Sequence, residues 1–352
     1  LQYNKAWRLG GGKIVCRLRR AIPGLKQASK CWYDRIVKFL RDEKFKPCPQ
    51  EPCVFFRMFR GKKQRLSLLV DDGMIYGEDL GPLKSKMSQE FSVKWLGPVH
   101  IFAGIKFTWN EHGVQLDQKM YVEKLGKKYA NLIDDIPAPS IPLNEVLLPD
   151  GKGEGDALLE DKEQYRTVVG SLLFATRITI PEVMFSVNQC CRFFNAPRRS
   201  HYEAALRILK YVVVNKDDLT ICYTRNCTHK GVVALSDSEF AGIDLEYRRS
   251  FFGYVIYLAG GPVVWAAKQL PFATRGVGQA EFVALSYTAE DVLTVRNVLK
   301  HIQLIEHVEE PSIICGDNTA AIGTAKGEMS GKRMKHLEMS YHLVRDYVLG
   351  KE

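Results

Sequence analysis

Two adjacent carboxylates at the end of an apolar run are the first residues that could do chemistry. The run Leu66–Val70 is typical of a buried strand, ends on Asp71 and Asp72, and is followed by a second apolar run from Met74. Neighbouring carboxylates repel each other, and a divalent metal ion is a strong candidate to compensate them. Asp72 and Gly73 are equally typical of a hairpin turn. This stretch alone leaves both interpretations open.

A second set of carboxylates lies at the ends of predicted elements in the last third of the chain. Asp237 lies on a predicted strand, Glu281 opens a long predicted helix, and Asp317 follows a short predicted strand. Each of them alone is more often a surface charge. Their joint occurrence at three element ends favours a metal site.

The first 65 residues are strongly basic. They hold 18 Lys and Arg against four acidic residues, whereas the whole chain carries a net charge of +10, so the remainder is net acidic. Aromatic residues Trp32, Tyr33, Phe55 and Phe56 are interleaved with these cations, which suits contact with a phosphate backbone. A merely solvated basic face is the alternative.

Cysteine and histidine form no convincing metal pattern. The nine cysteines are scattered without Cys-x-x-Cys pairs, which predicts free, reduced thiols. His336 and His342, with Glu338 between them, lie on different faces of a predicted helix, so zinc is not favoured. No run approaches the roughly 20 apolar residues that span a bilayer, and the sequence lacks a signal-peptide pattern, so we expect no membrane contact.

Helical and strand periods alternate in the first third of the chain. Apolar spacing predicts helices over 27–41, 83–91 and 119–131, and strands over 13–20, 54–56, from 66 onward, 101–109 and 113–116. Helices that cover one face of an antiparallel sheet give an α+β class.

The later part of the chain has two further regions. Residues 133–164 are rich in Pro, Gly and acidic residues and predict a linker or long loop. Predicted helices follow over 165–178, 181–194 and 200–214, then strands over 232–238, 251–258 and 263–267, a helix over 280–305, a strand over 313–315, and helices over 319–326 and 333–349. The last set has the order of a ribonuclease-H-like fold, in which Asp237, Glu281 and Asp317 meet at one sheet edge and can hold two Mg²⁺ ions.

A series of short motifs runs along nearly the whole chain. They are Val15-Cys16-Arg17-Leu18, Gly24-Leu25-Lys26-Gln27-Ala28, Trp32-Tyr33, Val70-Asp71-Asp72, Phe91–Gly97 with Phe102–Ile105, Val169-Gly170-Ser171-Leu172, Ala205–Tyr211, Ser236–Gly242, Ala280-Glu281-Phe282, Asp317-Asn318 and Lys335–Glu338. Their order and spacing resemble the copia-type LTR retrotransposon Pol polyprotein. Any one motif is weak, but the ordered set is highly specific.

The resemblance implies a reverse transcriptase followed by a ribonuclease H. It divides the chain into a partial reverse-transcriptase palm and start of the thumb over 1–135, a linker and helical connector over 136–226, and a ribonuclease-H-like α/β domain over 227–352. The first part is expected to lack the first catalytic strand, and the last to lack its final strand and helix.

The resemblance also implies roles for particular residues. Asp71 and Asp72 hold Mg²⁺, or alternatively Mn²⁺, for attack of a primer 3′-hydroxyl on an incoming dNTP. Asp237, Glu281 and Asp317 cut the RNA strand of an RNA–DNA hybrid, whose 2′-hydroxyls distinguish it from DNA. The remaining site residues are Lys26, Gln27, Arg17, Arg19 and Arg20 for nucleotide and template, and Glu338 as a further metal ligand.

The implied partners are an RNA template, a DNA primer, an RNA–DNA hybrid, dNTPs and the rest of the Pol polyprotein. The implied location is the cytoplasm or nucleus, within a virus-like particle for the parent element.

The sequence also departs from the family pattern. Leu69 replaces the usual Tyr, Pro23 replaces a Tyr, Ser29 replaces a Pro, and Gln279 replaces an acidic residue. No carboxylate precedes Asp34, whereas the polymerase of the family uses a third Asp on an earlier strand. A catalytically dead nucleic-acid-binding remnant is therefore the alternative function, and a host protein that reuses the fold for partner contacts is a third.

Overall fold

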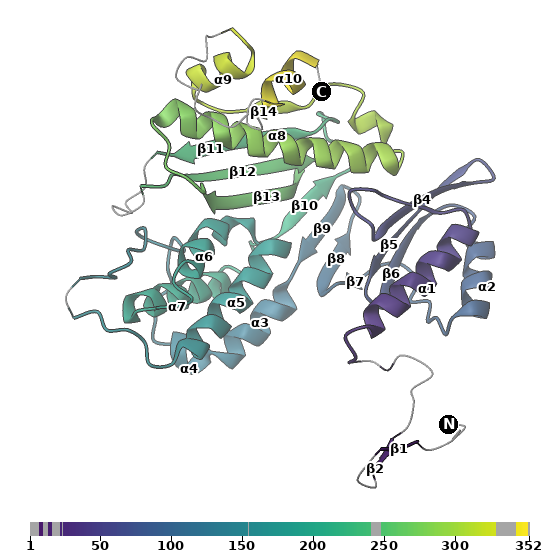
Figure 1. Cartoon of the computed structure of the whole chain (residues 1–352), viewed down its shortest axis with the longest axis horizontal. Helices are drawn as coiled ribbons and strands as arrows, with labels where there is room; N and C mark the ends of the chain where they lie inside the picture. The colour runs from purple at the N-terminus through teal and green to yellow at the C-terminus, as the bar shows by residue number, and fades with distance from the viewer. Residues whose placement is uncertain are drawn as a thin grey trace. The chain divides into compact units, whose positions relative to one another are not determined.

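The computed structural model describes residues 7–9, 13–15, 22, 24–153, 155–240, 248–328 and 343–350. The chain divides into two compact units, Leu1–Lys94 and Trp95–Glu352 (Figure 1). Both units combine helices with sheets, so the predicted α+β class is confirmed. The finer division at 135/136 and 226/227 stays a prediction.

The first unit is a four-stranded antiparallel sheet with two helices. The strand order is β3 (Lys46–Pro47), β4 (Val54–Phe59), β5 (Lys62–Leu69) and β6 (Asp72–Gly77), and the helices are α1 (Ala28–Asp42) and α2 (Gly81–Glu90). A separate two-stranded ribbon is formed by β1 (Trp7–Leu9) and β2 (Lys13–Val15). The apolar stripe of α1 meets Phe55 and Leu66 of the sheet in one core.

Two aromatic residues of the predicted nucleic-acid face lie in the interior. Phe55 is 0% exposed and Phe56 is 9% exposed, so neither ring can stack on a base. The prediction is wrong for these two residues, because the aromatic side chains of β4 are used to fill the protein interior.

A buried cation lies beside the core of the first unit. The Arg57 guanidinium lies over the rings of Phe45 and Phe59 and donates hydrogen bonds to Gln64 Oε1 at 2.8 Å and to the Glu43 carboxylate at 3.2 Å. Burial opposes ionisation of Glu43, but hydrogen bonds from Lys86 and Arg57 outweigh it and lower the pKa of this carboxyl. The paired charges stabilise each other where water is scarce.

The second unit begins with an antiparallel sheet in which two paired strands lie far apart in the sequence. Its order is β10 (Ile221–Thr224), β9 (Gly113–Asp117), β8 (Ile105–Trp109) and β7 (Ile101–Phe102). Strand β10 pairs with β9, with Ile221 opposite Leu116. The sequence did not predict β10, because four residues carry too little periodicity to be recognised.

A helical connector follows this sheet. Its helices are α3 (Lys119–Lys128), α4 (Ala130–Ile133), α5 (Lys162–Ile178), α6 (Met184–Cys191), which follows the 3-10 turn η1 (Pro181–Val183), and α7 (Arg199–Val214). They enclose a core that contains Tyr165, Leu172 and Leu209. The predicted helices of this region are present.

The segment predicted as a linker is a loop that packs against α7. Arg198 donates hydrogen bonds to the carbonyls of Pro149 and Asp156, at 3.2 and 2.6 Å. The Asp156 carboxylate accepts from the Ser200 amide at 3.1 Å, and despite the opposing effect of burial such hydrogen bonds lower its pKa to about 2. The Arg198 side chain and the first backbone amides of α7 therefore supply contacts that the composition of the loop lacks.

The last part of the second unit is a four-stranded sheet with β14 parallel to its neighbour. The order is β13 (Gly261–Gln269), β12 (Phe251–Leu258), β11 (Val233–Glu239) and β14 (Ile313–Cys315), followed by α9 (Thr319–Ala325) and α10 (Leu343–Gly350). Helix α8 (Val277–His301) runs along one face of the sheet (Figure 1) and packs its apolar side on Phe252 and Ile256. This is the order of elements predicted from the sequence.

The connector packs against the edge strand β13. The Trp265 indole donates to the Thr176 carbonyl at 2.8 Å, and the Asn188 amide donates to the Ala267 carbonyl. The rings of Phe185 and Phe251 meet edge to face at 5.9 Å between centroids. The predicted connector and nuclease-like parts therefore share one packed unit.

Two other sequence-based expectations concern the described residues. None of their helices is long and apolar enough to cross a bilayer. Their eight cysteines are free thiols, as predicted.

Candidate active site

Three carboxylates from distant parts of the second unit converge at one end of its last sheet. In the parallel pair β11 and β14, Leu235 lies opposite Cys315, so Asp237 and Asp317, each two residues further on, lie at the same end. Glu281 approaches from the first turns of α8. Oxygen atoms of the three carboxylates all lie within 4.8 Å of one another. The structure thus brings together the three residues that the sequence pattern grouped.

The environment of these carboxylates is unequal. Asp237 and Asp317 are exposed, whereas Glu281 is only 4% exposed. Burial raises the pKa of Glu281, and repulsion from Asp237 and Asp317 raises it further. Three oxygen donors in this arrangement fit a divalent cation such as Mg²⁺, which prefers carboxylate ligands and would relieve their repulsion.

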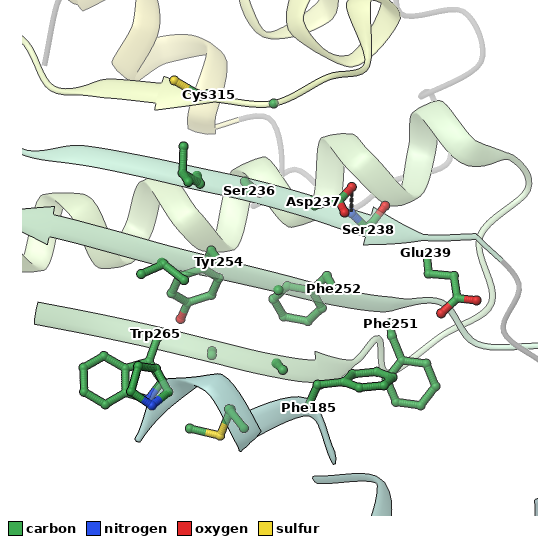
Figure 2. A pocket seen from close by; sticks show the side chains of 18 of the residues that line it. Phe185, Ser236, Asp237, Ser238, Glu239, Phe251, Phe252, Tyr254, Trp265 and Cys315 are labelled. Carbon is green, nitrogen blue, oxygen red and sulfur yellow. Dashed lines mark hydrogen bonds between the residues drawn. The ribbon is translucent and has the colours of Figure 1, made fainter. Parts of the chain in front are cut away.

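Local hydrogen bonds order the chain around each of the three carboxylates. The Asp237 carboxylate accepts a hydrogen bond from the Ser238 amide at 2.8 Å (Figure 2). Gln279, which replaces an acidic residue of the family motif, accepts from the Arg275 amide at 2.6 Å beside the start of α8. Asn318 caps α9 by accepting from the Ala321 amide at 3.0 Å. Gln279 and Asn318 therefore have local structural roles.

An open groove of about 650 Å³ adjoins Asp237 and Asp317. Figure 2 shows Phe185 and Phe251 at one end of it and Trp265 at the other. Glu182 of η1 also lines the groove. No sequence pattern selects Phe185, Trp265 or Glu182 as site residues, because the groove forms only where η1 and α6 of the connector pack on β13.

The pair Asp71 and Asp72 lies at the tip of the β5–β6 hairpin. The last cross-strand pair is Leu69 with Asp72, so the turn residues are Val70 and Asp71. The turn is therefore not formed by Asp72 and Gly73, because Gly73 pairs with Leu68 within the ladder. Both carboxylates are exposed. The hairpin exists and presents them at its tip.

The backbone at this tip is unusual. Val70 has φ +53°, in the left-handed region that β-branched residues rarely adopt. The indole N–H of Trp32 in α1 donates to the Val70 carbonyl at 2.8 Å. Sequence reasoning placed Trp32 on a nucleic-acid face and missed this contact.

The other predicted site residues are described only in part. Lys26 and Gln27 are exposed and directly precede α1. The remaining ones, Arg17, Arg19, Arg20 and Glu338, lie outside the described residues. Within the ranges that the structure describes, no third His, Cys, Asp or Glu groups with Asp71 and Asp72 as a metal site.

Comparison with known proteins identifies the family. Residues 10–144 match the family model "Reverse transcriptase (RNA-dependent DNA polymerase)". The chain is 28% identical to the retrovirus-related Pol polyprotein from transposon TNT 1-94 of Nicotiana tabacum, over 99% of this chain and 26% of that protein. It is 30% identical to the corresponding polyprotein from transposon RE1 of Arabidopsis thaliana, over 95% of this chain and 22% of that protein.

A shorter relative is covered almost completely. The chain is 31% identical to an uncharacterized mitochondrial protein of Arabidopsis thaliana, over 64% of this chain and 92% of that protein. In contrast, the chain spans about a quarter of the length of the two Pol polyproteins. These matches confirm the resemblance stated from the motifs: the chain belongs to the copia-type retrotransposon Pol polyprotein family and carries reverse transcriptase sequence of that family.

Proposed function

We propose that the chain acts within a longer Pol polyprotein in RNA-directed DNA synthesis, and that its second unit cuts the RNA strand of an RNA–DNA hybrid. The observation that carries the nuclease proposal is the convergence of Asp237, Glu281 and Asp317 within 4.8 Å. They come from two strand ends and a helix, and a chance meeting of three surface carboxylates does not readily explain this convergence.

The three carboxylates would hold Mg²⁺, or alternatively Mn²⁺. When bound, such ions supply an activated water and charge that stabilises the leaving oxygen. Asp237 and Asp317 are exposed beside the groove, so a scissile phosphate can approach them from solvent. Glu281 is buried beside them and, once it is ionised, adds a third negative charge to the site.

The polymerase role is proposed for the parent polyprotein. Asp71 and Asp72 would contribute two of its metal ligands, for attack of a primer 3′-hydroxyl on an incoming dNTP. Lys26 and Gln27 would contact the nucleotide, and the basic stretch around Arg17 the template. Since no carboxylate precedes Asp34, we do not expect the chain by itself to synthesise DNA.

A cleavage assay tests the nuclease proposal. Purified chain is incubated with an RNA–DNA hybrid labelled on either strand, with Mg²⁺ or with EDTA. We expect Mg²⁺-dependent cutting of the RNA strand only, abolished in Asp237→Asn and retained in Glu309→Gln, which removes an exposed charge that does not line the groove. Absence of cleavage by the unaltered chain would refute the proposal.

A binding-only remnant is the second candidate. The observations that favour it are the 18 Lys and Arg of the first 65 residues and the incomplete carboxylate set around Asp71. It predicts hybrid binding that weakens steeply as salt is raised, with no cleavage at any Mg²⁺ concentration. Measurement of hybrid binding at two salt concentrations, beside the cleavage assay, distinguishes the two candidates. A host protein that uses the fold for protein contacts predicts neither binding nor cleavage.

A further inference from the structure

We propose that Trp32 is a positioning residue that fixes the carboxylate turn at Val70–Asp71 relative to helix α1. The proposal deepens, and in its consequence for metal binding rests on, the proposed polymerase role of Asp71 and Asp72. It assigns to Trp32 an action through the backbone of the turn, without contact to the reacting groups.

The contact is direct and directional. The indole Nε1–H of Trp32 donates to the carbonyl oxygen of Val70 at 2.8 Å, which is the usual length of a good N–H···O hydrogen bond. Val70 is the first residue of the turn and Asp71 is the second. A hydrogen bond to the carbonyl of Val70 therefore fixes the peptide plane that leads into Asp71.

The turn has little else to hold it. Leu69 is 45% exposed and Val70 is 67% exposed, so apolar packing fixes neither side chain. Val70 also adopts φ +53°, which a branched side chain disfavours and which therefore needs outside support. A single well-placed donor has a large effect in such a turn.

Trp32 is itself held firmly enough to act as an anchor. The Trp32 ring meets the Phe91 ring edge to face, at 5.4 Å between centroids. Phe39 in turn meets the Phe91 ring at 5.3 Å. The Arg35 guanidinium lies over Phe91 and pairs with Glu90 at 3.0 Å. Because α1 and the end of α2 fix the indole together, its N–H keeps a defined direction.

The position of Trp32 in α1 connects the two predicted polymerase motifs. Lys26 and Gln27 directly precede the helix, and Trp32 lies five residues after Gln27, or about 7.5 Å along a helix axis at about 1.5 Å per residue. One rigid helix thus links the predicted nucleotide residues to the carboxylate turn. We infer that Trp32 fixes the spacing between them.

The test compares Trp32→Phe with Tyr33→Phe by amide hydrogen exchange. Phe retains an aromatic ring against Phe91 but has no N–H donor. Tyr33→Phe is the matched control, because it removes a neighbouring side-chain donor of α1, whose partner is the Pro52 carbonyl at 3.0 Å. We expect exchange over residues 69–73 to become about two- to twelvefold faster in Trp32→Phe only, the range for loss of one hydrogen bond.

A second readout follows metal binding to the turn. Terbium binding is followed by luminescence in proteins that all carry Asp237→Asn, so that binding at the Asp237, Glu281 and Asp317 cluster is weakened. We expect Trp32→Phe to weaken terbium binding about two- to twelvefold, and Asp71→Asn to weaken it more. If Asp71→Asn has no effect, the proposed metal role of the pair fails, whereas hydrogen exchange still tests Trp32.

Two results would overturn the assignment of Trp32. One is unchanged exchange over 69–73 in a folded Trp32→Phe protein. The other applies even if this variant does not fold: in the unaltered protein, the Trp32 indole N–H should exchange with solvent more slowly than a free indole. Exchange at the free rate, measured by NMR, means that the hydrogen bond to Val70 does not form.

Discussion

Without metal, the Asp237→Asn protein should be more stable to unfolding than the unaltered chain. With Mg²⁺ present, it should be less stable than the unaltered chain. Asn keeps an oxygen that can accept from the Ser238 amide, so the local hydrogen bond at 2.8 Å can persist. The substitution removes one negative charge from a cluster whose oxygens lie within 4.8 Å of each other. Only a site that binds a cation should show such a change of sign.

The magnitude follows from the separation of the charges. Two unit charges 4.8 Å apart repel by about 0.9 kcal/mol at a dielectric of ~80 and by about 3.5 kcal/mol at ~20. Because Asp237 and Asp317 are exposed, we expect a gain of about 1–2 kcal/mol in EDTA. With Mg²⁺ at 100 times its dissociation constant, the unaltered chain should instead gain about 2.7 kcal/mol that the variant lacks.

The pH dependence has a defined sign. Burial and the neighbouring carboxylates raise the folded-state pKa of Glu281 above its unfolded value, so the folded protein holds this proton more tightly. The metal-free protein should therefore lose stability as pH rises from the unfolded pKa, about 4.3, through the folded pKa. The gain in stability from Asp237→Asn in the metal-free protein should be fully present above the pH range in which Glu281 ionises, and absent well below it.

Denaturant unfolding in EDTA and in Mg²⁺, at neutral and acidic pH, measures these effects. Glu309→Gln is the matched control, since it removes one charge from an exposed position that belongs neither to the cluster nor to the groove. The reasoning is refuted if Asp237→Asn changes stability by the same amount and sign with and without Mg²⁺.

Two further predictions concern buried polar groups. Arg57→Met should cost the first unit about 2–4 kcal/mol in denaturant unfolding, because it leaves the Glu43 carboxylate without its buried partner, whereas Arg60→Met at an exposed ion pair should cost less than about 1 kcal/mol. Equal costs would contradict the role of burial. Burial lowers the pKa of His201, which accepts from the Arg198 amide at 3.1 Å as a neutral ring, so the second unit should lose stability as pH falls below about 6.5. His201→Gln should flatten that dependence, and an unchanged profile would contradict the assignment.

The cluster of Asp237, Glu281 and Asp317 was largely predictable because its residues lie at element ends. Strands β11 and β14 are short apolar runs, and their parallel pairing brings Asp237 and Asp317 to one end without any further requirement. Glu281 lies near the start of a helix that the apolar period defines. The groove could not be predicted, because Phe185 and Trp265 meet it only when the connector packs on β13.

The carboxylate turn was predictable in existence and not in position. Asp72-Gly73 is a common turn pair, so local chemistry pointed to it, whereas the turn is Val70-Asp71. A left-handed valine has no sequence signature, and its support comes from Trp32, which is 38 residues away. Likewise, basic residues interleaved with Phe55 fit both a stacking face and a core strand, and burial decided the outcome.

The pairing of β9 with β10 constrains the order in which the chain can fold during synthesis. The sheet of β7, β8 and β9 keeps one edge unpaired until Ile221–Thr224 has left the ribosome. Closing a loop of this length costs about 4 kcal/mol in the logarithmic chain-entropy term alone. The helices between the two strands shorten that search if they form first, because they convert a flexible loop into a compact spacer. A nascent chain stalled before residue 221 should therefore expose β9 to proteases and to strand exchange with other chains, a liability that ends once β10 is in place.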